Sequence, residues 1–352
     1  MSAPVRVLLV DDSRVHRAAV AAYLERAEGI ELVAEASDGA EGVERTLEHR
    51  PDLVLMDVRM PALDGLEATS RIMAERATPI LLMTAAENMS LEVDLGLRAL
   101  ERGALELIPK PDLETLRRGD EALARRIRLL AKVPVIAHPR GRRAAPPDPA
   151  PPLRDRPTTG LYRRASRVVV VCSSTGGPSA LLATLSRLPG DLPAALVLVQ
   201  HIDGAFEEGL ARWLDESCAL SVAVGKHEDP LVEGRALLAP QGMVAEVDAR
   251  RRLLLRPPSA REREPHCPSG DALFHSAARA YGSKALGVVL TGIGSDGATG
   301  LLEIHRAGGQ TVAQDEATSV VYGMPRVARE LGAAAHVVPL PEMARTIVEL
   351  LR

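Results

Sequence analysis

Short, almost wholly apolar runs alternate with longer amphipathic stretches along most of this chain. Over residues 1–130, five such runs are separated by stretches of helical length such as Arg14–Ala27 and Ala40–Arg50. Strands of a parallel sheet that is covered by helices on both faces have this near-continuous apolar character. We therefore expect a doubly wound parallel α/β domain in residues 1–130. The five runs are Val5–Val10, Ile30–Ala36, Asp52–Met56, Pro79–Met83 and Ala104–Ile108.

The same alternation returns over residues 167–352 and predicts a second doubly wound parallel domain. A hairpin-like stretch, Val244–Leu255, interrupts it. The expected strands are Arg167–Val171, Ala195–Val199, Leu220–Val224, Arg235–Ala239, Ala285–Leu290, Gly309–Ala313 and Val337–Val338. The expected helices are Pro178–Arg187, Glu207–Ser217, Ser269–Tyr281, Ala298–Ala307 and Pro325–Leu331.

Between the two regions, residues 131–166 have a different composition. Eight of the 26 prolines fall in 132–166, together with several arginines. Proline fixes φ and has no backbone donor, so this segment is neither a helix nor an inner strand. We expect a semi-extended linker. Its basic character suits either a solubilising spacer or a contact with an acidic partner or nucleic acid.

Composition excludes several classes of function. Aromatic residues make up 2% of the chain, which is too few for a stacking platform on single-stranded nucleic acid. The net charge of −4 provides no global attraction to DNA or to an anionic membrane. Three cysteines without a CxxC pair fit a reducing compartment, and no apolar run approaches the length of a signal or a membrane span. We expect a cytoplasmic protein with no specific nucleic-acid partner and no membrane insertion.

Polar residues follow the expected strands of the first domain. Asp11 and Asp12 follow the first run, Asp57 the third, Thr84 the fourth, and Lys110 the fifth. The carboxyl ends of parallel strands meet at one edge, so these residues converge there. Clustered carboxylates need a cation, and oxygen ligands suit Mg²⁺. Asp57 would then accept a phosphoryl group as an acyl phosphate, with Thr84 and Lys110 holding the phosphate oxygens. The alternative is that the acids cap a helix and the lysine is solvated.

These residues lie in motifs that resemble the receiver domain of two-component response regulators, over residues 4–130. The resemblance implies a flavodoxin-like fold, Asp57 as the phosphorylation site, a histidine kinase as phosphodonor, and Asp11 and Asp12 as the metal pair with the Arg59 carbonyl as a further ligand. Leu107 stands where many receivers carry an aromatic switch residue. The motifs are Val10-Asp11-Asp12, Met56-Asp57-Val58-Arg59-Met60-Pro61 with Asp64-Gly65, Met83-Thr84-Ala85 and Pro109-Lys110-Pro111.

In the second region, an apolar run leads into Cys172-Ser173-Ser174-Thr175-Gly176-Gly177. A strand, a sharp turn of small residues and a helix start approximate the nucleophile elbow of serine hydrolases. Such a turn equally binds phosphate or caps a helix. Ser173 and Ser174 are both candidate nucleophiles, and the spacing to Gly176 favours Ser174.

Two further residues follow strands of the same domain. His201 ends the second run, and Asp296 lies in a glycine-rich loop after Ala285–Leu290. A structural histidine and a helix-capping aspartate are the simpler interpretations. Together with a serine, however, they form a nucleophile, a base and an orienting acid, with glycine amides near a developing oxyanion. The letters of 292–297 also match a dinucleotide-binding GxGxxG, which is a weaker alternative.

The second region resembles the chemotaxis protein-glutamate methylesterases, and a receiver plus linker completes that architecture. The resemblance implies a Rossmann-like serine hydrolase domain. It implies Ser174, His201 and Asp296 as the triad, with Thr175 beside the imidazole and the amides around Ile293 as candidate oxyanion donors. The motifs are Ser174-Thr175-Gly176-Gly177, Gln200-His201, Pro268-Ser269 with Asp271-Ala272-Leu273-Phe274-His275, Thr291-Gly292-Ile293-Gly294-Ser295-Asp296-Gly297 and Tyr322-Gly323-Met324-Pro325.

The implied activity is hydrolysis of glutamyl methyl esters on methyl-accepting chemoreceptors, with release of methanol, together with deamidation of particular receptor glutamines. It needs no cofactor for the ester chemistry and is gated by phosphorylation of Asp57. We expect three parts: a receiver (1–130), a linker (131–166) and a catalytic domain (167–352). A regulator whose second domain only binds is the main alternative. The sequence departs from the family at four positions, of which Cys172 is expected to strain or reshape the elbow. The departures are Cys172 and Ser173 for Gly-Ala, Ser295 for Asn and Val244 for His.

Overall fold

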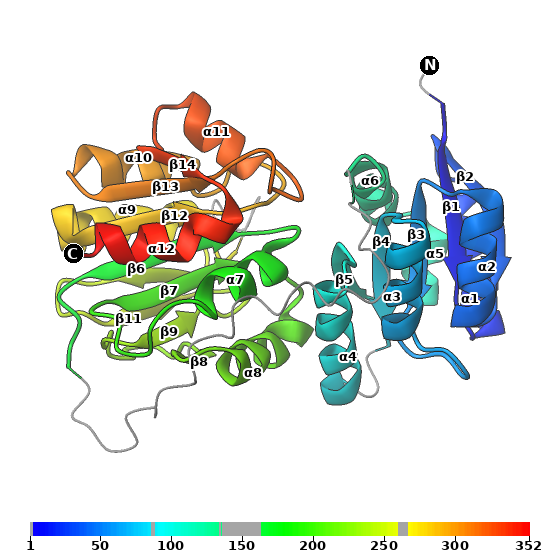
Figure 1. The fold of residues 1–352 in the computed structure, drawn as a ribbon, viewed down its shortest axis with the longest axis horizontal. Coiled ribbons are helices and arrows are strands. Elements are labelled where there is room, and N and C mark those ends of the chain that lie inside the picture. The colour runs from blue at the N-terminus through cyan, green and yellow to red at the C-terminus, as the bar shows by residue number, and fades with distance from the viewer. Residues whose placement is uncertain (1–2, 86–88, 134, 136–162, 260–266) are drawn as a thin grey trace. The chain divides into compact units, whose positions relative to one another are not determined.

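The computed structural model describes residues 3–85, 89–133, 135, 163–259 and 267–352. The chain forms two compact units, Met1–Pro146 and Pro147–Arg352 (Figure 1). Most of the expected linker, 134 and 136–162, lies outside the described residues.

The N-terminal unit contains one five-stranded sheet in which every pairing is parallel. Its strands are β1 (Val5–Val10), β2 (Ile30–Ala36), β3 (Leu53–Asp57), β4 (Ile80–Thr84) and β5 (Glu106–Pro109). Its helices are α1 (Arg14–Leu24), α2 (Gly39–His49), α3 (Gly65–Glu75), α4 (Met89–Glu101), α5 (Leu113–Arg118) and α6 (Glu121–Leu130). The strand order is β2-β1-β3-β4-β5. Helices α2, α3 and α4 pack side by side, and α1 packs against α5.

The apolar runs form strands here because both faces of the sheet are covered. Every residue of β3 and β4 is buried. Aspartates begin several helices by accepting backbone amides: Asp38 caps α2, Asp64 caps α3 and Asp112 caps α5. Helix α1 is capped by Ser13, whose side chain accepts from the amide of His16, so neither acid of the Asp11-Asp12 pair is its N-cap.

The C-terminal unit contains a seven-stranded parallel sheet and a separate antiparallel hairpin. The strands of the large sheet are β6 (Val168–Ser173), β7 (Ala195–Gln200), β8 (Ser221–Val224), β9 (Arg235–Leu238), β12 (Ala285–Val289), β13 (Gln310–Gln314) and β14 (His336–Val338). The hairpin pairs β10 (Val244–Val247) with β11 (Leu253–Arg256). The helices are α7 (Gly177–Leu185), α8 (Glu207–Ser217), α9 (Gly270–Tyr281), α10 (Ala298–Arg306), α11 (Met324–Glu330) and α12 (Leu340–Leu350), with short 3₁₀ turns η2 (Gly204–Phe206) and η3 (Gly282–Lys284).

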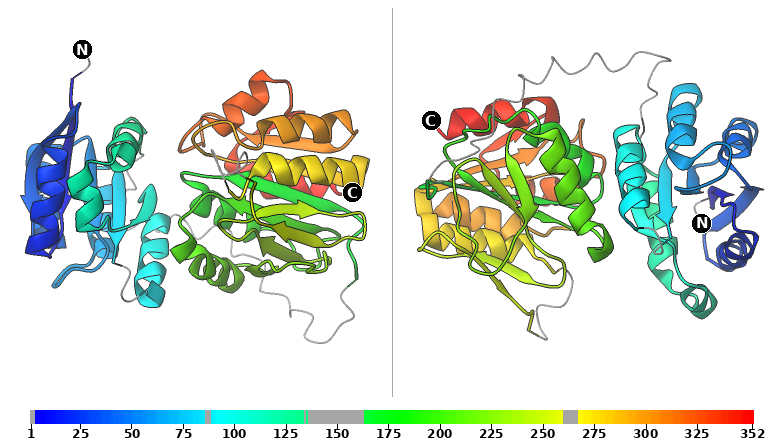
Figure 2. Two further views of the ribbon diagram at one scale, coloured as in Figure 1. Left: turned by 180° about the vertical axis from the view of Figure 1, so that it is seen from behind. Right: turned by 90° about the horizontal axis from the view of Figure 1, so that it is seen from below.

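The strand order β14-β13-β12-β6-β7-β9-β8 places the start of the domain in the middle of its sheet. The chain runs from β6 towards one edge and later returns on the other side of β6 with β12. Helices α9 and α10 pack together, as do α7 and α12, so both faces of the sheet carry helices (Figure 2). In open parallel sheets, this reversal of strand order is where sites form at the carboxyl ends of strands.

The predicted fold class is confirmed: both units are parallel α/β, and the expected hairpin is present. The boundaries differ by small amounts. The strand expected at Arg167–Val171 extends to Ser173. The strand expected at Ala104–Ile108 begins at Glu106, because the amide of Ala104 bonds back to Ala99 at the end of α4. Among the described residues, no helix combines the length and the apolar character needed to cross a membrane.

Helix α9 approaches α10 closely at Gly300. A Cβ at this position would lie 2.6 Å from the Cβ of Phe274 and 2.8 Å from the carbonyl oxygen of Asp271. We expect Gly300→Ala to destabilise the C-terminal unit by about 1–3 kcal/mol, because overpacking forces backbone shifts. Urea unfolding followed by the fluorescence of Trp213, the one tryptophan of the chain, measures this. Gly204→Ala is the control, since its added Cβ meets its nearest atom at 3.4 Å. Equal midpoints for the two variants would contradict the expectation.

Candidate functional site

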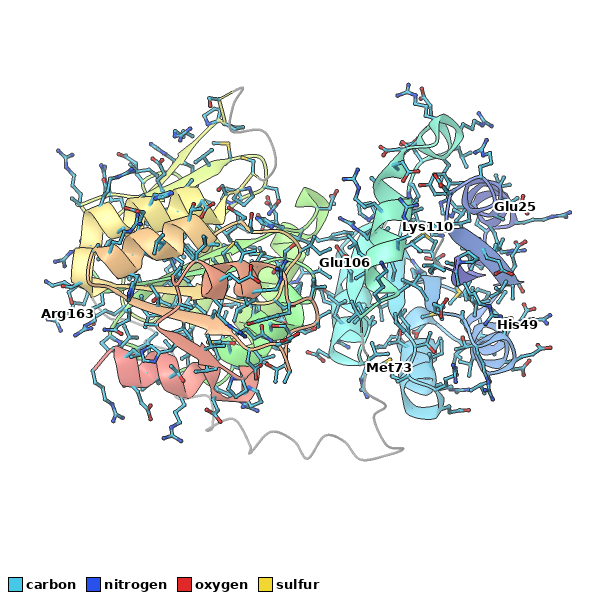
Figure 3. The ribbon with its side chains drawn as sticks, turned by 90° about the horizontal axis from the view of Figure 1, so that it is seen from above. Glu25, His49, Met73, Glu106, Lys110 and Arg163 are labelled. Carbon is cyan, nitrogen blue, oxygen red and sulfur yellow. The ribbon has the colours of Figure 1, made fainter. Side chains whose placement is uncertain are left out.

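Three carboxylates of the N-terminal unit meet at the carboxyl end of its sheet. Asp11 follows β1, Asp57 ends β3, and one carboxylate oxygen each from Asp11, Asp12 and Asp57 lie within 4.8 Å of one another. Asp11 and Asp57 are buried, whereas Asp12 is exposed. Lys110, labelled in Figure 3, follows β5 and places its Nζ 2.5 Å from Oδ2 of Asp57 and 3.0 Å from Oδ2 of Asp11. Thr84 ends β4, and the amide of Lys110 donates to its carbonyl. The five predicted residues therefore come together.

This cluster holds more negative than positive charge. Burial raises the pKa of Asp57 to about 6; the nearby charge of Asp11 adds to this, while Lys110 opposes it. For Asp11, burial also raises the pKa, but hydrogen bonds and charge from His16 and Lys110 outweigh it and lower the pKa overall. Oxygen-only donors with unneutralised charge fit a hard divalent cation such as Mg²⁺. The residues that could hold such an ion are Asp11, Asp12 and Asp57.

His16 belongs to this cluster, and the sequence reasoning missed it. Its Nδ1 lies 2.6 Å from Oδ2 of Asp11, and its Nε2 lies 3.2 Å from the carbonyl oxygen of Pro111. The imidazole thus connects α1, the first acid and the loop after β5. The sequence around His16, three residues after the cap Ser13, contains no pattern that indicates a contact with Pro111, which lies 95 residues later.

Leu107, which stands at the expected aromatic position, is directed into the unit. Its side chain is buried, and a Cβ at Gly96 of α4 would overlap it. The small residue in α4 therefore makes room for this leucine. Position 107 therefore carries a buried aliphatic side chain where many receivers have an aromatic ring.

In the C-terminal unit, Ser174 directly follows β6, His201 directly follows β7, and Asp296 lies in the loop between β12 and α10. Strand β6 pairs with both β7 and β12. The amide of Ser174 donates to the carbonyl of Thr291 at 3.0 Å, and the amide of His201 donates to the carbonyl of Ser173 at 3.0 Å. Backbone hydrogen bonds therefore join the serine to the loops that carry the other two residues.

The imidazole and the carboxylate are in direct contact. Nε2 of His201 lies 2.9 Å from Oδ2 of Asp296. The same Oδ2 accepts from the amide of Gly270 at 2.6 Å, and Oδ1 accepts from the amide of Asp271 and the hydroxyl of Ser269, each at 3.0 Å. These donors are the first residues of α9, where unpaired amides favour an anion.

This environment keeps Asp296 ionised. Burial by itself raises the pKa of this carboxyl, but the hydrogen bond and charge of His201 and the amides of Asp271 and Gly270 outweigh burial and lower the pKa to about 2. A carboxylate that stays charged holds the imidazole in one orientation and stabilises its protonated form. The motif containing Ser269 and Asp271 was visible in the sequence, but its role as the source of hydrogen bonds to the Asp296 carboxylate was not.

The structure separates the two candidate serines. Ser173 is the last residue of β6 and is fully buried, and its Oγ donates to Oε1 of Gln200 at 2.7 Å. Ser174 is partly exposed. The same Gln200 donates through Nε2 to the carbonyls of Ser174 at 2.9 Å and His201 at 2.8 Å. Ser173 therefore orients an amide that joins the serine and histidine backbones, and its hydroxyl is not available as a nucleophile.

The turn after Ser174 relies on glycine. Gly176, the N-cap of α7, has a φ of +74°, and a Cβ on Gly177 would overlap the amide of Gln200. A Cβ on Gly292 would lie 2.7 Å from Cβ of Ser174, so the loop that carries the half-buried Ile293 approaches the serine closely. Thr175 is buried, and its carbonyl accepts from the hydroxyl of Thr291 at 3.0 Å.

The glycine-rich loop at 292–297 follows β12 and supplies Asp296 to His201. A dinucleotide fingerprint instead follows the first strand of its βαβ unit, so this alternative loses its structural context. Val244, where the resemblance led us to expect histidine, begins β10 and is buried.

The structure shows how the side chain of Cys172 is accommodated at this turn. Residues 172–175 all keep negative φ, because the extra bulk is taken up elsewhere. The thiol occupies space that a side chain at Gly270 would otherwise fill. A side chain at Gly297 would also contact Cys172. Its Sγ lies 3.8 Å from Oδ2 of Asp296. Burial raises the pKa of the Cys172 thiol well above its usual range, and the charges of Asp296 and Asp271 raise it further.

Comparison with known proteins adds independent observations. Residues 169–347 match the family model "CheB methylesterase", and residues 7–118 match "Response regulator receiver domain". A protein-glutamate methylesterase/protein-glutamine glutaminase 2 of Anaeromyxobacter dehalogenans (strain 2CP-C) is 44% identical over 354 residues, which cover 99% of this chain and 98% of that protein. A protein-glutamate methylesterase/protein-glutamine glutaminase 3 of Myxococcus xanthus (strain DK1622) is 41% identical, with coverage of 98% and 94%. The crystal structure of the Thermotoga maritima CheB methylesterase catalytic domain has 32% identity and a TM-score of 0.49, and covers 52% of this chain and 98% of that one.

The low pKa of Asp296 implies that its carboxylate stabilises the folded state. The pKa of this carboxyl falls from an ordinary 3.8 to about 2 on folding. The ionised carboxylate therefore stabilises the folded state at pH values above 3.8, and this stabilisation is lost as the pH falls towards 2. Asp296→Asn should therefore cost about 2 kcal/mol at neutral pH. The difference from wild type should shrink as pH falls below about 4.

Urea unfolding of both proteins between pH 7 and pH 3, followed by Trp213 fluorescence, measures this difference. Asp191→Asn, at an exposed position, is the control and should change little. A difference that is absent at pH 7, or that grows on acidification, would contradict the proposed environment of Asp296.

Proposed function

Because the chain belongs to the CheB methylesterase family, we propose that it is a protein-glutamate methylesterase regulated by its receiver unit. Its substrates are glutamyl methyl esters on methyl-accepting chemoreceptors, which it hydrolyses to glutamate and methanol. It also deamidates particular receptor glutamines. The observation that carries the proposal is the pairing of His201 with Asp296 at 2.9 Å, on loops bonded to the backbone at Ser174.

The proposed mechanism assigns one role to each member of the triad. Oγ of Ser174 attacks the ester carbonyl while His201 accepts its proton. Since Nε2 of His201 is bonded to Asp296, Nδ1 is the ring nitrogen that takes the proton. Asp296 holds the ring and stabilises the imidazolium. Methanol leaves with the proton from His201, and water then hydrolyses the acyl-serine by the same base.

The oxyanion of each tetrahedral intermediate needs preorganised donors. The amides of Thr175 and of the loop around Ile293 are the candidates, because the turn at Gly176 and the close approach of Gly292 bring both backbone segments to Ser174. With a glutamine substrate, the same steps release ammonia instead of methanol. No cofactor enters this chemistry.

We assign regulation to the acid cluster of the N-terminal unit. Asp57 accepts a phosphoryl group that originates from a histidine kinase, and Lys110 and Thr84 hold the phosphate oxygens. Asp11, Asp12 and Asp57, together with the Arg59 carbonyl, would hold Mg²⁺, which offsets negative charge when bound. Phosphorylation then raises the esterase activity as a population shift between two states of the protein. The functional parts are the receiver (1–130), the linker (131–166) and the catalytic domain (167–352), in a cytoplasmic protein.

The first activity prediction separates the two adjacent serines. Ser174→Ala should reduce methanol release from methylated chemoreceptor membranes by at least about a thousandfold, because the nucleophile is lost. Ser173→Ala should keep methanol release within about tenfold of wild type, because it removes only the hydroxyl that orients Gln200. The reverse pattern, with Ser173 essential and Ser174 dispensable, would overturn the assignment.

The second activity prediction concerns regulation. With Mg²⁺ and a small phosphodonor, wild type should release methanol faster than without them, and Asp57→Asn should lose this stimulation while keeping its basal rate. Asp38→Asn, which alters a helix cap of the same unit, is the matched control and should remain stimulated. Stimulation that persists in Asp57→Asn would show that another residue receives the phosphoryl group.

A further inference from the structure

A second set of metal-ligating atoms lies in the C-terminal unit. One ligand atom each from Cys172, His201 and Asp296 lie within 4.8 Å of one another. We propose that these three side chains bind Zn²⁺, and that the bound ion inhibits the enzyme. The inhibitory part of this inference rests on the proposed serine mechanism; the binding part does not.

Two of the three distances between these atoms are close to those of a zinc site, and the third lies within 4.8 Å. Sγ of Cys172 lies 3.8 Å from Oδ2 of Asp296, and Nε2 of His201 lies 2.9 Å from the same oxygen. With zinc distances of about 2.3 Å to sulfur and about 2.0–2.2 Å to nitrogen and oxygen, tetrahedral ligand atoms are separated by roughly 3.2–3.8 Å. The sulfur–oxygen pair already fits, and the nitrogen–oxygen pair has to open by a few tenths of an ångström. A water molecule supplies the fourth ligand.

Charge and ligand type favour this ion over others. A thiolate, a carboxylate and a neutral imidazole together carry two negative charges, which Zn²⁺ neutralises in a buried setting. Thiolate and imidazole ligands select zinc and similar transition metals, whereas carboxylates alone suit Mg²⁺. The acid cluster of Asp11, Asp12 and Asp57 contains no sulfur or nitrogen, so the two sites prefer different metals.

Zinc at this position would stop catalysis through the histidine. The ion takes Nε2, so the ring keeps its one proton on Nδ1 and cannot accept the proton of Ser174. The thiol of Cys172 loses its proton to solvent, so binding releases one proton. Cys172 is required because a residue without a ligand atom at this position would leave only two protein ligands.

Cobalt is the probe for binding, because a Co²⁺–thiolate bond gives a charge-transfer absorption that oxygen ligands do not produce. The experiment uses the full chain with saturating Mg²⁺, so that the acid cluster is filled. Wild type should develop this absorption with one Co²⁺ per chain, and excess Zn²⁺ should abolish it. Cys172→Ala and Cys172→Ser should lose it, whereas Cys218→Ala, a matched change at another buried cysteine, should keep it.

Methanol release tests inhibition in the same proteins, each compared with its own zinc-free rate. Cys172→Ala should need at least about tenfold more Zn²⁺ for half inhibition than wild type or Cys218→Ala. Trp213 fluorescence confirms that each variant is folded. Absence of the thiolate absorption in folded wild type, or equal zinc sensitivity of Cys172→Ala and Cys218→Ala, would overturn the proposal. If neither the wild type nor any variant releases methanol in the absence of zinc, the proposed function fails. The cobalt spectrum still decides whether the metal site exists.

Discussion

The C-terminal site depends on how one buried carboxylate, that of Asp296, is kept charged. A buried acid without partners would be protonated and could not orient an imidazole. Here the amides of Gly270 and Asp271 and the hydroxyl of Ser269 at the start of α9 all donate to it. The helix therefore provides, through its unpaired amides, the donors that water would supply elsewhere. The position of His201 follows from this arrangement.

Both units use the same property of parallel sheets, that the ends of several strands meet at one edge. In the N-terminal unit the ends of β1 and β3 bring acids to Lys110 at the end of β5, and the surplus negative charge suits a hard cation. In the C-terminal unit, β6 lies between β7 and β12, so Ser174, His201 and Asp296 follow three adjacent strands at the same edge, and His201 contacts Asp296. One architecture carries two different sets of side chains because the loops after the strands differ.

The strands, the hairpin and most site residues could be predicted from the sequence, since apolar runs define buried strands and polar residues follow them. The contacts that hold the site could not. The orientation of Ser173 towards Gln200, the contact of His16 with the carbonyl of Pro111 and the space for Cys172 beside Gly270 all join residues distant in sequence. Such contacts depend on tertiary packing, and no local pattern encodes them. The packing of Cys172 is one example, because the glycine that makes room for its thiol lies 98 residues away.

The central claim is that Ser174 is a nucleophile activated by His201. Reaction of the full chain with a fluorophosphonate, which modifies activated serines, followed by peptide mass spectrometry, tests it most directly. We expect covalent modification at Ser174 and none at Ser173, with labelling slowed at least about a hundredfold in His201→Gln. Modification at Ser173, or equal labelling rates in wild type and His201→Gln, would contradict it.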